Sequence, residues 1–298
     1  MTAITPFKIS TITATGCVNA EINLNTLFTS IEINPHVDEG VLYAELGSNK
    51  KGTSKKSNIQ KRKIVETSKK FDNQLTLEYR MRIDTKHTIL NCKIFKNGNV
   101  QMTGIKYVGQ GSIFVDRIID IIKHAASATP DIGKLENTNY LIRMINCDYK
   151  IGFPIKRDSL FKIMINDYDN MCSFEPCIYP GVKIQYMWNK QNKYRDGICK
   201  CNSVCVNGKG CGDGEANCKK ITIAVFQSGC VIITGAQSED QIVETYNWIN
   251  DIIISNKNRI EKKNVVIPNE TEAPTKKIMI PKSKIISLRP LGSNDKCF

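Results

Sequence analysis

The sequence contains no long apolar run, and nowhere approaches the roughly 18 residues that a membrane-spanning helix needs. Its amino terminus also lacks the pattern of a secretory signal peptide. We therefore expect a soluble intracellular protein without a membrane partner. In that setting the twelve cysteines are reduced thiols or metal ligands rather than a disulfide framework.

A catalytic pattern is missing as well. The sequence shows no Ser/His/Asp arrangement, no glycine loop that could cradle a phosphate and no carboxylate pair at a repeated position. The three histidines, His36, His87 and His124, have no spacing that suggests a site. We predict that the protein is not an enzyme.

Acidic residues are scarce relative to basic ones. The chain has 29 Asp and Glu against 42 Lys and Arg, which gives a net charge of +13 and a pI near 9.1. An excess of positive charge this large favours polyanionic partners, with nucleic acid first and an anionic membrane second.

What the chain does contain is an internal repeat. Residues 95–104 and 226–235 share Phe, Gly, Val, Thr and Gly at identical offsets, so the two stretches align without a gap. Two further pairs of segments also match, and they occur in the same order in both halves: 22–28 with 155–161, and 35–41 with 176–182. A period this long is not a solenoid, whose repeats span roughly 20–50 residues. The repeat instead predicts two copies of one half-domain that build a common surface.

Each half shows the same succession of signals: a strand, a short helix, further strands, a hairpin and a final amphipathic helix. This order predicts an α+β fold in which helices back one antiparallel sheet. For the third strand of the first half, residues 41–46 and 75–82 are both candidates, and the repeat favours 41–46. The predicted organisation is a first half (1–128) with a basic insert (47–73), a second half (129–255) with a Cys-rich insert (189–219), and a basic, Pro-containing tail (256–298).

The two inserts differ in chemistry. The basic residues of 49–70 are interleaved with Gly and Ser, which predicts a disordered loop that attracts DNA. The second insert carries five cysteines, Cys199, Cys201, Cys205, Cys211 and Cys218. Four thiolates can form a closed tetrahedral zinc site, so we expect one structural zinc held by four of the five. Unligated thiols, or a disulfide-stapled loop, are the alternatives. The other cysteines, including Cys92, Cys147 and Cys177, are expected to be small core residues.

A duplicated chain that ends each copy in Phe-x-x-Gly-x-Val-x-x-Thr-Gly and then an amphipathic helix resembles the TATA-box-binding protein family. The second half is the more similar, with Phe174-Glu175-Pro176-Cys177-Ile178-Tyr179-Pro180-Gly181 before its third strand. The resemblance covers residues 7–254 without the inserts, and the composition is similar to versions carried by large nucleocytoplasmic DNA viruses. It implies a pseudo-twofold saddle with a continuous curved antiparallel sheet, whose concave side lies in the DNA minor groove.

The resemblance assigns roles to particular residues. Phe95 and Phe226 match a wedge phenylalanine of each half, and Tyr179 matches the second wedge of the second half. In the first half that second position falls near Asp38, with Val37 as a substitute. Lys106 matches a phosphate-contacting lysine.

The expected groove-contacting residues are less symmetric. Thr103 and Thr234 match the paired central threonines. Thr11 and Met144 align with the family's paired asparagines, and Thr13 and Asn146 on the same strands could replace them. Ile232 is presented by the second half, where the first half has Gln101.

The resemblance therefore implies a transcription initiation factor that binds and bends A·T-rich promoter DNA as a monomer. Its implied partners are double-stranded DNA, a transcription factor IIB-like protein and RNA polymerase. Its implied location is the site of transcription: a viral factory in the host cytoplasm, the virion or the nucleus. A DNA-packaging protein with little sequence preference is the main alternative, and a zinc-dependent enzyme built on the Cys-rich insert is a third.

Overall fold

The computed structural model describes residues 4–54, 73–83, 85–125, 129–130, 132–205 and 208–263. The predicted disordered loop at 49–70 is wrong at its start, because Asn49–Gly52 forms strand β3. From residue 55 onward that prediction falls outside the described residues, as does the tail beyond residue 263. Among the described residues, no helix is both long and apolar enough to cross a membrane.

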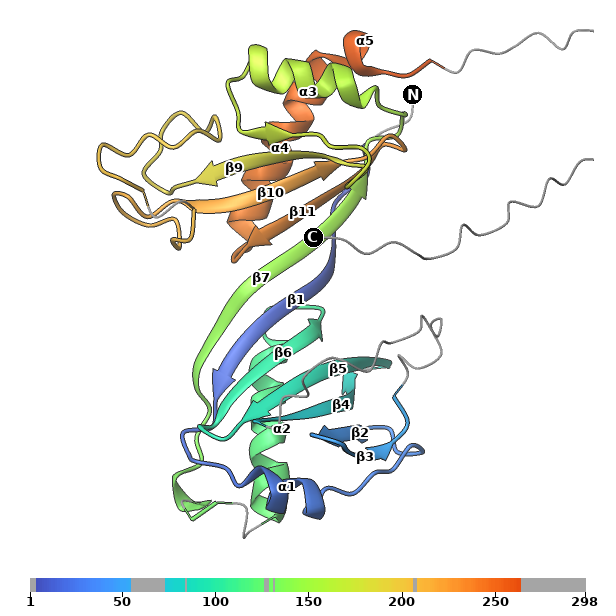
Figure 1. Cartoon of the computed structure of the whole chain (residues 1–298), viewed down its shortest axis with the longest axis vertical. Helices are drawn as coiled ribbons and strands as arrows, with labels where there is room; N and C mark the ends of the chain where they lie inside the picture. The colour runs from blue at the N-terminus through green and yellow to red at the C-terminus, as the bar shows by residue number, and fades with distance from the viewer. Residues whose placement is uncertain are drawn as a thin grey trace, which may run out of the picture. The chain divides into compact units, whose positions relative to one another are not determined.

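The first half follows the predicted order of elements (Figure 1). Its elements are β1 (Lys8–Cys17), α1 (Leu24–Ser30), β2 (Gly40–Leu46), β3 (Asn49–Gly52), β4 (Gln74–Ile83), β5 (Lys86–Phe95), β6 (Asn99–Ile105) and α2 (Gln110–His124). A short 3-10 turn at Ile132–Lys134 leads to the second half.

In the described part of the chain, the second half repeats this succession with one strand fewer and one α-helix more. Its elements are β7 (Thr138–Lys150), α3 (Arg157–Asn166), β8 (Cys172–Ser173), β9 (Val182–Trp188), β10 (Lys219–Val225), β11 (Cys230–Ala236), α4 (Glu239–Ser255) and α5 (Lys257–Ile260).

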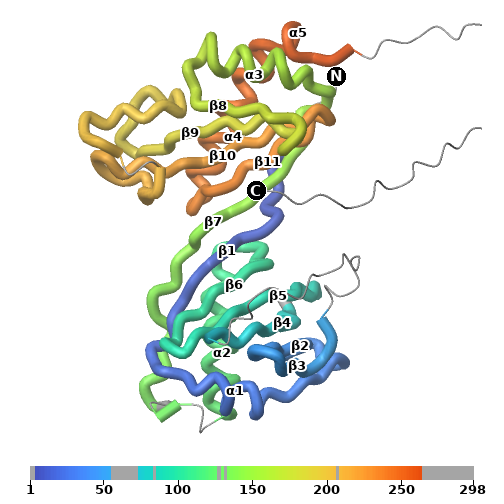
Figure 2. The backbone as a smooth tube through the Cα atoms, in the orientation of Figure 1, coloured from blue at the N-terminus to red at the C-terminus, as the bar shows by residue number. Residues whose placement is uncertain are grey.

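The strands of the described residues form one antiparallel sheet in the order β3-β2-β4-β5-β6-β1-β7-β11-β10-β9-β8. The long strands β1 and β7 pair with each other and join the two halves (Figure 2). The predicted continuous sheet backed by helices is therefore confirmed.

Local sequence explains where the helices and hairpins begin and end. The Asn23 side chain accepts hydrogen bonds from the backbone N–H groups of Asn25 and Thr26, both at 3.1 Å, and so caps α1. Ser238 caps α4 by accepting from the Gln241 N–H at 3.4 Å, within the capping-box sequence Ser238-Glu239-Asp240-Gln241. The β10–β11 hairpin turns at Gly229, whose φ of +79° is a conformation that favours glycine.

The pairing of strands shows that the halves are true structural copies. Ala14 of β1 pairs with Met102 of β6, and Cys147 of β7 pairs with Ile233 of β11. Cys147 is thus the counterpart of Ala14, and Ile233 is the counterpart of Met102. The sequence repeat of 95–104 with 226–235 also aligns Met102 with Ile233. The same correspondence continues at the next three positions along both pairs of strands. The internal repeat therefore reflects one half-domain built twice in the same register.

The same comparison corrects the third strand of the first half. Ile94 of β5 pairs with Leu75 of β4, whereas its counterpart Val225 of β10 pairs with Val182 of β9. Strand β4 therefore occupies the place of β9, and β2 lies one position further out. The preference for 41–46 was wrong, because a sequence match at a loop does not fix which strand pairs with β5.

The core lies between the sheet and helices α2 and α4, which run behind the strands in Figure 1. Helix α2 contributes Phe114, Ile118 and Ile122, and α4 contributes Ile242 and Ile249, all at 0 % exposure. The opposite face of the sheet, which we call the open face, is not covered by these helices.

The fold extends past the predicted end of the second half. Residues 257–260 form α5, and Lys262 donates its backbone N–H to Pro154 O at 2.8 Å. Ile260 is fully buried. The fold therefore continues beyond the predicted boundary at residue 255, because the apolar side chain of Ile260 anchors the residues that follow.

Candidate nucleic-acid interface

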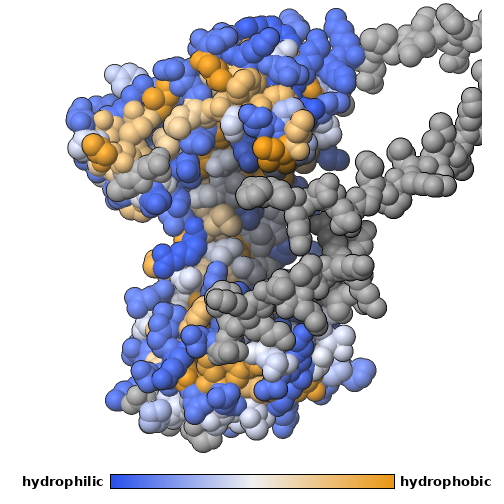
Figure 3. Space-filling model, in the orientation of Figure 1, coloured by the Kyte–Doolittle hydropathy of each residue, from blue (hydrophilic) through white to orange (hydrophobic). Residues whose placement is uncertain are grey.

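Strand alternation defines which side chains the open face presents, since successive residues point to opposite faces. Around the junction of the two halves it presents hydroxyl, amide and apolar side chains, together with the Asp148 carboxylate. They are Thr11, Thr13 and Thr15 of β1, Gln101 and Thr103 of β6, Met144, Asn146 and Asp148 of β7, and Ile232 and Thr234 of β11. Figure 3 shows hydrophobic and hydrophilic surface interleaved on the side that Figure 1 turns toward the viewer.

The centre of this face is the β1–β7 pair, where Thr11 pairs with Asn146 and Thr13 pairs with Met144. The correspondence that relates Ala14 to Cys147 also relates Thr11 to Met144 and Thr13 to Asn146. The two pairs therefore exchange under the repeat, and the pseudo-twofold axis passes between them. The four positions that the sequence assigned to the centre are brought together there.

Hydrogen bonds at the centre are unequal in the two halves. In the second half, the Thr234 hydroxyl donates to Asn146 Oδ1. Within the described residues the Asn146 amide NH₂ has no hydrogen-bond partner, so it remains available as a donor. In the first half, Thr11 Oγ1 accepts from the backbone N–H of Gly104 at 3.1 Å. The centre thus carries an amide donor on one side and hydroxyls on both.

The two predicted wedge positions of the second half form one aromatic pair. The rings of Tyr179 and Phe226 lie 5.7 Å apart between centroids at an interplanar angle of 58°. The Lys183 ammonium lies 4.3 Å from the Tyr179 ring centroid, within the range of a cation–π contact. A Cβ at Gly181 would lie 2.9 Å from the tyrosine ring and 3.2 Å from the phenylalanine ring, so glycine allows this packing.

The first half has a different arrangement around Phe95. Phe95 borders a hollow on the open face whose other lining residues include Thr15, Gln101, Leu141 and Arg143. Arg143 donates from Nε to Thr15 Oγ1 at 2.9 Å, which holds its guanidinium at the edge of this hollow.

Asp38 is not equivalent to Tyr179, contrary to the sequence alignment. Since β4 takes the place of β9, the equivalent position precedes Leu75 rather than Val41. That position falls at residues 71–72, whose sequence is Phe-Asp and which lie outside the described residues. Asp38 instead forms a salt bridge with Arg82 at 3.1 Å. Val37 cannot take the place of the second wedge either, because it lies in the same loop before β2 as Asp38.

Two cations on the open face, Lys93 and Lys183, were missed by the sequence interpretation. Lys93, Lys183 and Lys220 lie at open-face positions of β5, β9 and β10. Period-two alternation along these strands was the signal that could have identified them. Lys106, which was predicted, donates its ammonium to Ser10 O at 2.5 Å and remains exposed.

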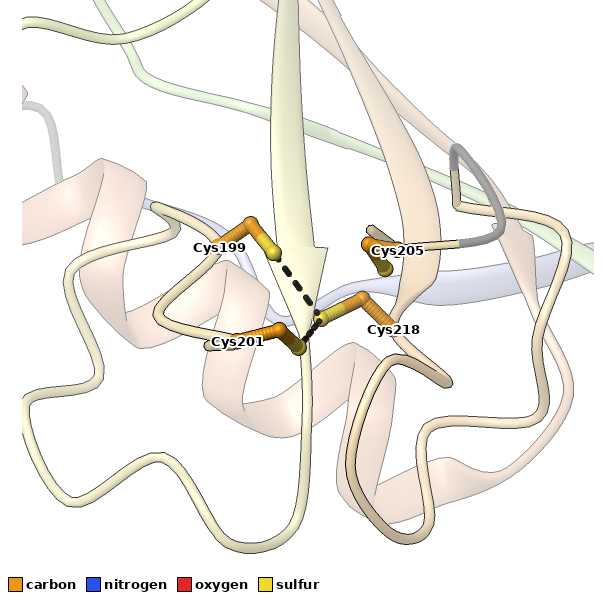
Figure 4. A group of neighbouring side chains, drawn as sticks. All are labelled: Cys199, Cys201, Cys205 and Cys218. Carbon is orange, nitrogen blue, oxygen red and sulfur yellow. Dashed lines mark hydrogen bonds between the residues drawn. The ribbon is translucent and has the colours of Figure 1, made fainter. Parts of the chain in front are cut away.

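Four of the five insert cysteines converge, as predicted. The sulfur atoms of Cys199, Cys201, Cys205 and Cys218 all lie within 4.8 Å of one another (Figure 4). Cys218 Sγ is 3.5 Å from Cys201 Sγ and 3.6 Å from Cys199 Sγ. A tetrahedral zinc with bonds of about 2.3 Å would separate its sulfurs by about 3.8 Å. The cluster therefore has the donor set and the approximate dimensions to hold a metal such as zinc.

Cys211 is the cysteine that does not join this cluster. It is exposed, and its sulfur accepts from the Asn217 amide at 3.1 Å. Its backbone carbonyl accepts from Gln241 Nε2 of α4 at 3.2 Å, so this part of the insert is tied to the final helix. Asn189 reaches the cluster itself, since its amide lies 3.7 Å from Cys218 Sγ.

The insert lies at the opposite end of β10 from Phe226, because it joins Trp188 to Lys219 whereas Phe226 follows Val225. Lys200 forms a salt bridge with Asp196 at 3.0 Å, and burial lowers the pKa of the Lys219 ammonium.

Of the other cysteines predicted to be core residues, Cys92 and Cys147 are fully buried, whereas Cys17, Cys172 and Cys230 are partly exposed. Burial raises the pKa of the Cys147 thiol to about 12. The prediction is wrong for Cys177, which is exposed in the loop that carries Tyr179.

Each comparison with known proteins finds a TATA-binding protein. The model of the family described as "Transcription factor TFIID (or TATA-binding protein, TBP)" matches residues 139–255. A TATA-box-binding protein-like protein of Acanthamoeba polyphaga mimivirus is 27% identical over 271 residues, which cover 88% of this chain and 67% of the relative. TATA-box-binding protein 2 of Entamoeba histolytica is 23% identical over 55% of this chain and 58% of the relative.

Among solved structures, the Methanococcus jannaschii TBP matches with a TM-score of 0.47 and 17% identity, over 84% of this chain and 99% of that chain. The assignment of the fold rests instead on the paired halves, the continuous sheet and the helices behind it. The chain is thus similar to the TATA-binding proteins in the sequence pattern of residues 139–255 and, over 88% of its length, to the mimivirus relative.

Proposed function

We propose that this protein binds the minor groove of A·T-rich duplex DNA with its open face, bends the duplex and acts in transcription initiation. The observation that carries the proposal is the set of hydroxyl and amide groups at the pseudo-twofold centre, formed by Thr11, Thr13, Asn146, Thr103 and Thr234. Proteins of the TATA-binding family are DNA-binding factors rather than enzymes, and the open face offers a binding surface of that kind.

The chemistry of this centre suits A·T pairs. In the minor groove an A·T pair presents the acceptors adenine N3 and thymine O2, whereas a G·C pair adds the guanine amine as a donor. The Asn146 amide can donate to such acceptors because its own oxygen is occupied by Thr234. Threonine hydroxyls can rotate to donate as well. Ile232 supplies an apolar contact beside them.

The aromatic pair at the end of the second half supplies the means of bending. Apolar wedges that enter between base steps unstack them and kink the duplex, a behaviour for which TATA-binding proteins are a known example. Tyr179 and Phe226 already lie together on the open face. Phe95 is placed to act at the first half. The net charge of +13 adds attraction for the phosphate backbone.

The partners follow from the proposed role. Resemblance to the family supports recruitment of a transcription factor IIB-like protein and of RNA polymerase by a monomer on DNA. The similarity to a mimivirus protein supports action where a large DNA virus transcribes its genome. Pull-down with the virus's own transcription factor IIB-like protein, with and without promoter DNA, tests this recruitment directly.

We further propose that Cys199, Cys201, Cys205 and Cys218 hold one zinc ion. Four thiolates close the coordination shell, which is the arrangement of structural sites rather than catalytic ones. The Asn189 amide beside Cys218 Sγ is placed as an outer-shell donor that orients this ligand. The metal would order a glycine-rich loop that has few apolar residues of its own.

The deciding experiment compares A·T-rich with G·C-rich duplexes at equal salt, with affinity and end-to-end fluorescence transfer measured for each. We expect tighter binding and a bend on the A·T-rich duplex. Equal affinities with a steep dependence on salt, and no bend, would instead favour a DNA-packaging protein.

A further inference from the structure

The two ring-bearing segments of the second half come from separate parts of the chain. Tyr179 lies in the loop 174–181 before β9, and Phe226 begins the turn 226–229 after β10. Tyr179 and Gly229 are held within their own segments by backbone hydrogen bonds to Glu175 O at 2.8 Å and Phe226 O at 3.0 Å. Their rings meet on the open face, where the pairing of Val182 with Val225 brings the loop and the turn side by side.

One side chain contacts both segments. Arg157 is the first residue of α3, and its guanidinium donates to Pro180 O in the loop and to Gln227 Oε1 in the turn, the latter at 3.3 Å. The same guanidinium lies 5.1 Å from the ring centroid of Phe174, at the start of the loop. A planar guanidinium can form hydrogen bonds in two directions while it stacks, which a lysine cannot do.

Among the residues that the structure describes, the first half shows no such bridge. The sequence repeat aligns Arg157 with Leu24, which is the first residue of α1 and is buried in the core. Leucine has no donor. The turn after Phe95 is attached to the segment before α1 by backbone bonds, from Val18 N to Gly98 O at 3.0 Å and from Ile22 N to Lys96 O at 2.7 Å. Bonds of the same kind join Ile151 and Ile155 to the turn of the second half, so Arg157 is an addition to a shared arrangement.

We propose that Arg157 is a positioning residue that holds Tyr179 and Phe226 as one preformed wedge. This inference rests on the proposed function, because it concerns how the DNA-bending pair is prepared. A wedge that is ordered before binding avoids the entropy cost of ordering it on the DNA. The second half therefore enters the groove with its wedge in place.

The first test uses the protein without DNA. Hydrogen exchange is measured at the amides of Tyr179, Gly229 and Gly98 in the wild type and in Arg157→Gln. We expect exchange at Tyr179 and Gly229 to accelerate by about ten-fold or more, the effect of losing a hydrogen bond to a charged group. Exchange at Gly98 should not change. Unchanged exchange at all three amides would overturn the proposal.

The second test measures the bend on A·T-rich duplex at saturating protein. Arg157→Gln should give a smaller bend than the wild type, and Arg157→Lys should recover part of it because one donor is retained. The matched control is Arg259→Gln, which removes the same charge and a bond to Asp167 in the same half, away from the open face. If the wild type bends DNA and Arg157→Gln bends it equally, the inference fails. If the wild type does not bend DNA, the proposed function fails, and the hydrogen-exchange test still stands by itself.

Discussion

At the scale of single residues, the described parts of the two halves present different aromatic groups. Phe226 packs against Tyr179, whereas within the described residues Phe95 has no aromatic neighbour. Removing Phe226 therefore removes a wedge and also leaves Tyr179 without its support. The two phenylalanines match in the sequence repeat but differ in what surrounds them.

We predict that Phe226→Ala weakens DNA bending and binding more than Phe95→Ala does. The expected difference is about 1–3 kcal/mol, the range for loss of a stacked aromatic contact with a base. Binding isotherms and the bend on one A·T-rich duplex measure both variants side by side. Equal losses would show that the halves wedge equally.

Gln101 and Ile232 are the second residue-scale difference, because they occupy equivalent positions in β6 and β11. The Gln101 side chain is exposed on the open face. Its amide oxygen can accept from the guanine amine, whereas an isoleucine would leave that amine without a partner.

We therefore predict that Gln101→Ile increases discrimination against a G·C pair at one position of the site by about ten-fold, within the usual cost of a mismatched pair. A panel of duplexes with one G·C pair moved along an A·T-rich site gives the profile. Ile232→Val is the matched control and should leave the profile as it is. A Gln101→Ile profile identical to the wild type would contradict the prediction.

At the scale of elements, the hairpins and final helices could be predicted, because turn glycines, the Ser238 cap and helical periodicity are local signals. The pairing of β4 with β5 could not, since β2 and β4 both have the alternation of a strand. Their places depend on partners far along the chain. The repeat of Pro, Gly and Val before β2 and β9 was misleading for this reason.

The candidate site shows the same division. Spacing showed that the insert could hold a metal, but which four cysteines converge depends on how the loop folds back onto β10. The hydrogen bond from the Asn217 amide to Cys211 Sγ is one of the contacts within the folded loop. Arg157 was missed because its contacts bring together three segments that no sequence pattern relates.

The Cys-rich insert gives a prediction at this scale. Protein purified in reducing buffer without chelator should contain one zinc per chain, and Cys211→Ser should keep it. Cys218→Ser should lose it, because this is the buried ligand closest to two others. Elemental analysis measures the zinc stoichiometry. The affinity of Cys218→Ser for A·T-rich DNA should fall by less than the affinity of Phe226→Ala. Substoichiometric metal, together with Cys–Cys bonds found by mass spectrometry, would replace zinc with the disulfide alternative.

At the scale of the whole molecule, the sheet runs without interruption from β3 to β8 through the β1–β7 pair. Buried side chains on both sides of that pair belong to one core cluster. The halves are therefore expected to unfold together rather than as two independent domains.

The two tryptophans allow a direct test, because Trp188 and Trp248 both lie in the second half. Leu77→Ala in β4 removes a fully buried side chain of the first half and should cost about 2–5 kcal/mol. We predict that the unfolding midpoint detected by tryptophan fluorescence falls by the same amount as the midpoint detected by circular dichroism. A fluorescence transition that stays in place while the other moves would show separate unfolding.

The connection between β9 and β10 runs from residue 189 to 218, whereas its counterpart between β4 and β5 consists of residues 84 and 85. A duplicated protein on a nearly symmetric duplex can sit in either of two directions, and transcription needs one. Each ten-fold preference between the directions requires only about 1.4 kcal/mol. A large, chemically distinct loop on one half also gives a partner protein a single place to dock. The partner can then assemble in one orientation even where the DNA contacts alone hardly distinguish the two orientations of the protein.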